Sequence, residues 1–219
     1  MAQHQTLRWK IGDVSITRIL ELVLSVEYYE KYPFMREARP AALREIPWLY
    51  PHFVSAEGEL LISIHALLVQ TPDFNLLVDT CVGNDKPRKI TSNQALHTEF
   101  LHDLAATGCD RETIDYVVCT HLHVDHVGWN TMKVADSWQP TFPNSRYLLG
   151  RIEYEYWSKS KAEDQVPVME DSVTPIFEAG LVDLVETDHK ISDEVRLLPT
   201  TGHTPGHVSV LIESGHQKA

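Results

Sequence analysis

HLHVDH, residues 121–126, is the segment that decides how the rest of this sequence is interpreted. It brings three histidines and an aspartate together directly after the apolar run YVVCT at 116–120. Imidazole nitrogen and carboxylate oxygen are common zinc ligands. Because side chains alternate along a strand, His121 and His123 would project to the same side if the strand continues through them. The segment therefore predicts a metal site at the end of a strand.

A second segment, TTGHTPGH at 200–207, follows another apolar run. Its glycines and proline favour a tight turn. Taken alone, the segment is explained equally well as a turn without a metal ligand. Paired with HLHVDH, it predicts that His203 completes a three-nitrogen site with the two alternating histidines, while Asp125 and His126 face a second metal. We interpret His207 as a residue that orients the ligands without binding metal.

Asp79 ends the apolar segment LLVDT at 76–80. A carboxylate buried at the end of a strand needs hydrogen-bond donors or a cation nearby. The histidine-rich segment offers backbone amides and ring N–H groups. We therefore predict that Asp79 organises the ligands and is not itself a ligand.

Apolar runs and helical stripes interleave along the chain, which favours an α/β or α+β class with layered sheets. An apolar helical stripe that ends just before Gly108 predicts one helix. A second helix is expected directly after the strand predicted at 146–149. The predicted helices cover 94–107 and 151–158. The predicted strands cover 14–24, 60–71, 76–80, 116–120, 146–149, 182–186, 195–199 and 208–213.

The stretch from Val26 to Phe53 contains four prolines, so helices within it must be short or interrupted. Its rings can pack as a loop onto the core, or they can form an aromatic wall over a pocket. In the second interpretation Tyr28, Tyr29 and Trp48 contact the substrate. Seven aromatic residues lie in the stretch: Tyr28, Tyr29, Tyr32, Phe34, Trp48, Tyr50 and Phe53.

The chain has 219 residues and a net charge of −12, with 31 acidic against 19 basic residues. An acidic surface argues against nucleic acid and anionic membranes as partners. Three cysteines without a CxxC pair favour a reducing compartment. With no leader-like or membrane-spanning run, we expect a cytoplasmic protein that acts on a small molecule, with a homodimer as a possible assembly.

VDT at 78–80, THLHVDH at 120–126 and TGHTPGH at 201–207 resemble the motifs of the metallo-β-lactamase superfamily. Within it, the chain is similar to the branch of N-acyl-homoserine lactone lactonases and methyl-parathion-type organophosphate hydrolases. VDTCVGNDK at 78–86 and the aromatic stretch before it support that branch. The resemblance covers nearly the whole chain from Asp13 onward.

This resemblance implies a four-layer αββα sandwich in a single domain, 1–219, with metals at one edge of its two sheets. It implies two zinc ions per complete chain, with iron, manganese or cobalt as alternatives, bridged by hydroxide. The implied ligands of one ion are His121, His123 and His203. Asp125 and His126 are those of the other.

The sequence departs from the family pattern near residue 219. Two-metal members continue to a bridging aspartate and a final histidine, and neither is present before Ala219. We therefore expect that C-terminal strands and helices belong to a longer protein. His216 is a poor substitute ligand, because its tail, ESGHQKA, is polar and is predicted to lack a supporting strand.

Together these features predict a metal-dependent hydrolase that uses zinc-bound hydroxide on a lactone or ester-like substrate with an apolar portion. Asp125 is the expected catalytic residue, since it can relay a proton to the leaving oxygen while it binds the second ion. One alternative is an organophosphate triester hydrolase. Another is a non-catalytic metal-binding module, if the chain truly ends at residue 219.

Overall fold

The computed structural model describes residues 7–26 and 37–219. Contacts divide the chain into two compact units, one of residues 1–21 with 65–219 and one of residues 22–64. Every predicted metal-site residue belongs to the first unit. None of the described helices is long and apolar enough to cross a membrane.

The larger sheet has seven strands in the order β1-β2-β3-β4-β5-β8-β9. β1 pairs with β2 and β3 with β4 in antiparallel register, whereas β4, β5, β8 and β9 run parallel. The parallel strands are short and apolar, as expected for strands covered on both faces. Their bounds are β1 Arg8–Ile11, β2 Val14–Val26, β3 Leu60–Gln70, β4 Asn75–Val78, β5 Tyr116–Cys119, β8 Arg146–Gly150 and β9 Val182–Val185.

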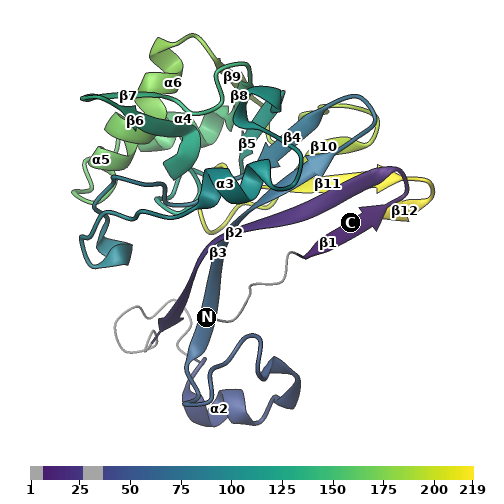
Figure 1. Cartoon of the computed structure of the whole chain (residues 1–219), viewed down its shortest axis with the longest axis vertical. Coiled ribbons are helices and arrows are strands. Elements are labelled where there is room, and N and C mark those ends of the chain that lie inside the picture. Colours follow the sequence, from purple (N-terminus) through teal and green to yellow (C-terminus); the bar gives the residue numbers. More distant parts are fainter. Residues whose placement is uncertain (1–6, 27–36) are drawn as a thin grey trace. The chain divides into compact units, whose positions relative to one another are not determined.

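A second sheet contains β10 (Val195–Pro199), β11 (Val208–Ser214) and β12 (Gln217–Lys218), all antiparallel. The prediction that the ESGHQKA tail lacks a strand was wrong. The chain turns through Gly215 and His216, both with positive φ, and β12 then pairs with the end of β11 (Figure 1). A polar hairpin carries little hydrophobic periodicity, so the sequence pattern did not indicate it.

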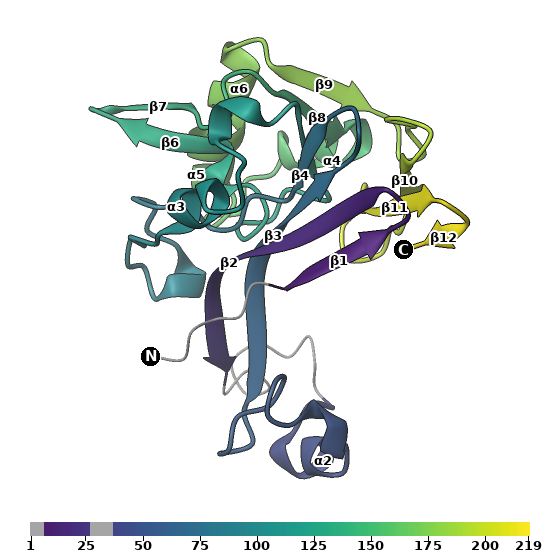
Figure 2. The ribbon, with the colours of Figure 1, turned by 45° about the vertical axis from the view of Figure 1, so that its right-hand side comes forward.

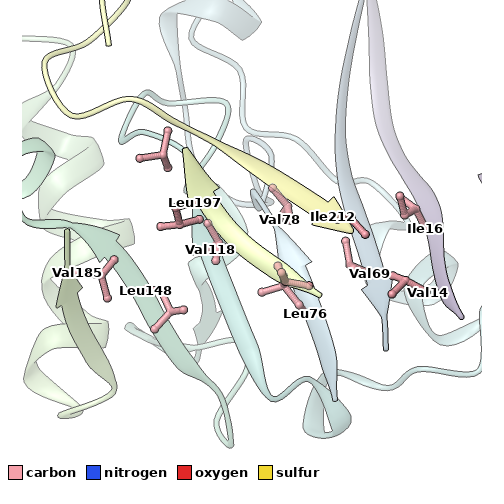
Figure 3. Packing of buried hydrophobic residues seen from close by; sticks show 12 residues of the cluster. Val14, Ile16, Val69, Leu76, Val78, Val118, Leu148, Val185, Leu197 and Ile212 are labelled. Carbon is pink, nitrogen blue, oxygen red and sulfur yellow. The ribbon is translucent and has the colours of Figure 1, made fainter. Parts of the chain in front are cut away.

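The core of the larger unit lies between these two sheets. Figure 3 shows Leu197 and Ile212 of the smaller sheet facing Val118, Val78 and Val69 of the larger one. All five side chains are at most 7% exposed. Two apolar sheet faces packed in this way form the inner layers of the mixed α/β metallo-β-lactamase fold predicted from the sequence.

Short helices belong to the same unit, and α4 packs against β8 and β9. The predicted helix at 94–107 is shorter than expected. Residues before Phe100 instead bridge to the preceding loop, because Thr98 donates its amide to Asn84 and Leu96 pairs with the same residue. The helices are α3 Phe100–Ala105, α4 Arg151–Trp157, α5 Val166–Val168 and α6 Thr174–Glu178.

Several further elements, α5 and α6 among them, were not predicted from the sequence. β1 pairs with the start of β2, and β6 (Thr131–Val134) forms a hairpin with β7 (Ser137–Pro140), visible in Figure 2. A π-helical turn at Met169–Val173 joins α5 to α6. Each is short and mixes polar with apolar residues, so no clear period marks it.

In the second unit, prolines limit the helices as predicted. α2 (Pro40–Arg44) begins at a proline, and a single 3₁₀ turn follows at Pro47–Leu49. Trp48 is 71% exposed and meets Phe53 edge-on. Tyr28 and Tyr29 lie outside the described residues. The assignment of these aromatic residues to substrate binding stays a prediction.

Candidate metal centre

Loops that follow three strands meet at one end of the sheets. Asp79 follows β4, and residues 120–128 follow β5, its parallel neighbour, so these two loops emerge side by side. The loop after β10 joins them, since the Val208 amide donates to the Thr120 carbonyl at 3.0 Å. β5 ends at Cys119, so the strand does not continue through the histidines, and a loop aims them instead.

Three histidines converge in this loop region, and we call them the imidazole cluster. Potential ligand atoms of its three members all lie within 4.8 Å of one another. Nδ1 of His123 and Nε2 of His203 are 3.0 Å apart. Nε2 of His121 is buried and has no hydrogen-bond partner among the described residues. Its members are His121, His123 and His203.

The environment favours the neutral form of two imidazoles of this cluster, those of His121 and His123. Burial, reinforced by the surrounding histidines, lowers the pKa of His121 to about 2. Burial and the nearby His203 also lower the pKa of His123. Neutral imidazole is the form that binds a metal, so the lowered pKa values of His121 and His123 are compatible with a role as metal ligands.

A second group, the carboxylate cluster, consists of Asp79, Asp125 and His126. Nδ1 of His126 lies 2.8 Å from Oδ2 of Asp79, and its Nε2 lies 3.4 Å from Oδ2 of Asp125. Burial opposes a charge on His126, but the two carboxylates outweigh it and raise its pKa. Burial likewise opposes a charge on Asp125, and the hydrogen bond and charge of His126 overcome it to lower its pKa.

Asp79 connects the loop after β4 with the loop after β5. Its carboxylate accepts the Thr120 amide at 2.8 Å and the Thr120 hydroxyl, in addition to facing the His126 ring. Its own backbone has a φ of 59°, which an aspartate tolerates better than most residues. These contacts fit the predicted organising role, which stays a prediction.

His207 lies beside the imidazole cluster but is not one of its converging ligands. Its ring centroid is 4.9 Å from that of His121 and 6.0 Å from that of His203. Its Nδ1 is 2.9 Å from the Thr200 hydroxyl, a contact within its own loop. This placement is compatible with the role predicted from the sequence.

Sequence reasoning missed the residues that hold the loops from the helical side. Glu153 of α4 is 1% exposed, and its carboxylate accepts the amides of Leu122 and Gly206 and the indole N–H of Trp157. Gln165 donates to the Leu122 carbonyl at 2.7 Å. An acidic residue in the first turn of a helix looks like an ordinary helix-end charge, so the sequence carried no specific signal for it.

Comparison with known proteins places this geometry in context. The model of the metallo-beta-lactamase superfamily matches residues 61–219. An N-acyl homoserine lactonase from a Bacillus species is 28% identical over 174 residues, which cover 72% of this chain and 61% of that protein. The lactonase of Bacillus cereus is 27% identical over 176 residues, which cover 80% of this chain and 62% of the relative. The chain thus spans about three fifths of the length of these relatives.

Solved structures show the same fold. A probable metal-dependent hydrolase from Staphylococcus aureus superposes with a TM-score of 0.75 at 20% identity, over 96% of this chain and 73% of that one. AidC, described as a dizinc quorum-quenching lactonase in complex with a product, gives a TM-score of 0.72 at 21% identity, over 97% of this chain and 72% of its own.

Proposed function

The chain belongs to the metallo-beta-lactamase superfamily, and on that premise we propose that it is a metal-dependent hydrolase acting on a lactone or a related ester. The observation that carries this proposal is the imidazole cluster. One nitrogen from each of three imidazoles lies within 4.8 Å of the other two, and the buried Nε2 of His121 lacks any described partner. A buried polar atom without a partner is costly, and a metal ion would supply the missing one.

The donor set fits zinc. Three protein nitrogens with room for a further ligand are typical of catalytic zinc sites, whereas structural sites are closed by four protein ligands. His121, His123 and His203 would hold this ion. When bound, zinc lowers the pKa of a coordinated water to about 7 and polarises a carbonyl oxygen.

We propose that Asp125 and His126 hold a second ion. Ligands about 2.1 Å from a tetrahedral zinc lie roughly 3.4 Å apart, and Nε2 of His126 lies 3.4 Å from Oδ2 of Asp125. The other ring nitrogen of His126 faces Asp79, a carboxylate–histidine arrangement that fixes ring orientation at metal sites. The AidC description of two zinc ions supports this proposal.

Asp125 has a further role in the proposed reaction. Its carboxylate is partly exposed at the site, with a side-chain exposure of 29%. A positioned carboxylate can carry a proton to the oxygen that leaves when a lactone ring opens. We therefore propose that Asp125 transfers this proton.

The substrate class rests on the relatives. Both Bacillus relatives are named as N-acyl homoserine lactonases, and AidC is described with a product homoserine bound. These support an N-acyl lactone as the first substrate to test, in agreement with the apolar portion predicted from the sequence.

The direct test is hydrolysis of N-hexanoyl homoserine lactone by zinc-loaded protein, with His121→Ala as the matched inactive variant. We expect ring opening that depends on added zinc and is lost in the variant. Zinc binding without hydrolysis of this lactone or a chromogenic ester would favour the metal-binding module. Absence of zinc binding would refute the proposed metal centre.

A further inference from the structure

A single buried carboxylate lies between the two loops that carry the imidazole cluster. Oε1 of Glu153 accepts the Leu122 amide at 3.2 Å, and Leu122 is the residue between His121 and His123. Oε2 of the same carboxylate accepts the Gly206 amide at 2.8 Å, three residues after His203. One side chain therefore contacts the backbone of both ligand-bearing loops.

The surroundings hold this carboxylate in place. Glu153 is 1% exposed, and the Trp157 indole donates to Oε1 at 2.6 Å. The Trp157 ring also packs against the His123 ring, with centroids 5.1 Å apart. Gly206 permits the close approach, because a Cβ there would lie 2.4 Å from the Glu153 backbone nitrogen. Three donors and this tight packing leave the carboxylate little freedom.

The Leu122 peptide is held on both sides. Glu153 takes its N–H, and Gln165 donates to its carbonyl at 2.7 Å, while the Leu122 side chain is fully buried. A peptide fixed in this way sets the direction of the histidines on either side of it. The partners of the Glu153 carboxylate are all N–H donors. Removing the carboxylate would therefore leave two buried backbone amides, those of Leu122 and Gly206, unpaired.

We propose that Glu153 is a positioning residue that sets the spacing between His123 and His203. This inference rests on the proposed metal centre. The carboxylate does not touch the substrate, and it acts through the two loops. Outer groups that orient metal ligands in this way commonly change metal affinity about 10–100-fold when replaced.

The chain contains a matched control for the hydrogen-bond pattern. Glu21 lies in β2 and belongs to the same unit as the imidazole cluster. It accepts the amides of Val82 and Gly83 and the indole N–H of Trp129. It thus binds two backbone amides and one tryptophan, as Glu153 does, but these partners lie outside residues 120–126 and 201–207, the segments that carry the imidazole cluster.

The experiment compares zinc affinity, by competition with a chromogenic chelator, in the full chain and in Glu153→Gln and Glu21→Gln. We expect both variants to lower the unfolding midpoint, but only Glu153→Gln to weaken zinc binding, by about 10–100-fold. The absorption bands of the cobalt-substituted protein should shift in Glu153→Gln alone, because they report ligand geometry.

Trp157→Phe is the milder variant, since it removes one donor to the carboxylate and keeps a ring beside His123. It should weaken zinc binding several-fold while the protein stays folded. Equal zinc affinity and equal cobalt spectra in Glu153→Gln and Glu21→Gln would overturn the inference. If Glu153→Gln does not fold, an unchanged zinc affinity in Trp157→Phe would overturn it instead. Failure of the unsubstituted chain to bind zinc would overturn the proposed function, and this inference with it.

Discussion

The two halves of the candidate metal centre differ in what their polar atoms already contact. In the imidazole cluster the ring nitrogens face one another, and the buried Nε2 of His121 has no described partner. In the carboxylate cluster His126 lies between two carboxylates that satisfy both its nitrogens. The first cluster contains a buried nitrogen without a described partner, whereas in the second the protein itself supplies partners to the His126 ring. We therefore expect substitutions in the first to affect metal binding more.

The largest effect is expected from His121→Ala. Only two cluster nitrogens would remain, so zinc affinity should fall by more than the roughly 100-fold seen for outer groups, and lactone hydrolysis should drop to background. Equilibrium dialysis with zinc measures the first, and a pH-indicator assay the second. His102→Ala, at an exposed position of α3, is the control and should change neither. Full zinc content in His121→Ala would show that the cluster is misassigned.

Asp125→Asn should separate the two halves of the centre. The variant should keep one zinc on the imidazole cluster, lose the second, and hydrolyse the lactone about 10²–10⁴-fold more slowly, because the proton carrier is gone. Elemental analysis and turnover on the same sample test this. If it keeps two zinc ions and full activity, the role given to Asp125 is wrong.

A smaller effect is expected from Asp79→Asn. The asparagine can still accept the Thr120 amide, but it loses the charge that faces His126. Turnover should fall about 10–100-fold, while the first zinc stays bound. Loss of all zinc from this variant would mean that Asp79 supports both clusters and not the carboxylate cluster alone.

The smallest effect should come from His207→Gln. The glutamine can keep a hydrogen bond to Thr200, so the loop should hold its shape and most of the zinc. Turnover should fall by about 10-fold, at the lower end of the range for groups outside the ligand set. Complete loss of zinc would exchange the roles of His203 and His207.

Most strands of both sheets could be predicted because they are apolar runs bounded by polar turns, whereas β1 and β12 are short and largely polar or exposed. Val195–Pro199 was predicted with its observed bounds, and Tyr116–Thr120 was one residue too long. The helix expected at 94–107 shows where periodicity fails. Its apolar stripe continues into residues that the Asn84 side chain holds in a loop instead. A contact between distant parts of the chain outweighed the local pattern.

The histidines of the candidate site could be identified because three of them share one short segment and a fourth follows a strand end. Glu153 and Gln165 could not. Their importance lies in which backbone groups they reach, and that depends on how α4 and α5 pack beside the loops. The single-domain assignment of residues 1–219 stays a prediction.

The most direct test of the central claim is the zinc content of the purified chain after zinc loading and gel filtration, measured beside His121→Ala. The account predicts at least one zinc per chain in the unsubstituted protein and none in the variant, because it assigns the bound ion to the imidazole cluster. An unsubstituted protein without zinc, or a variant that keeps as much zinc as its parent, would contradict it.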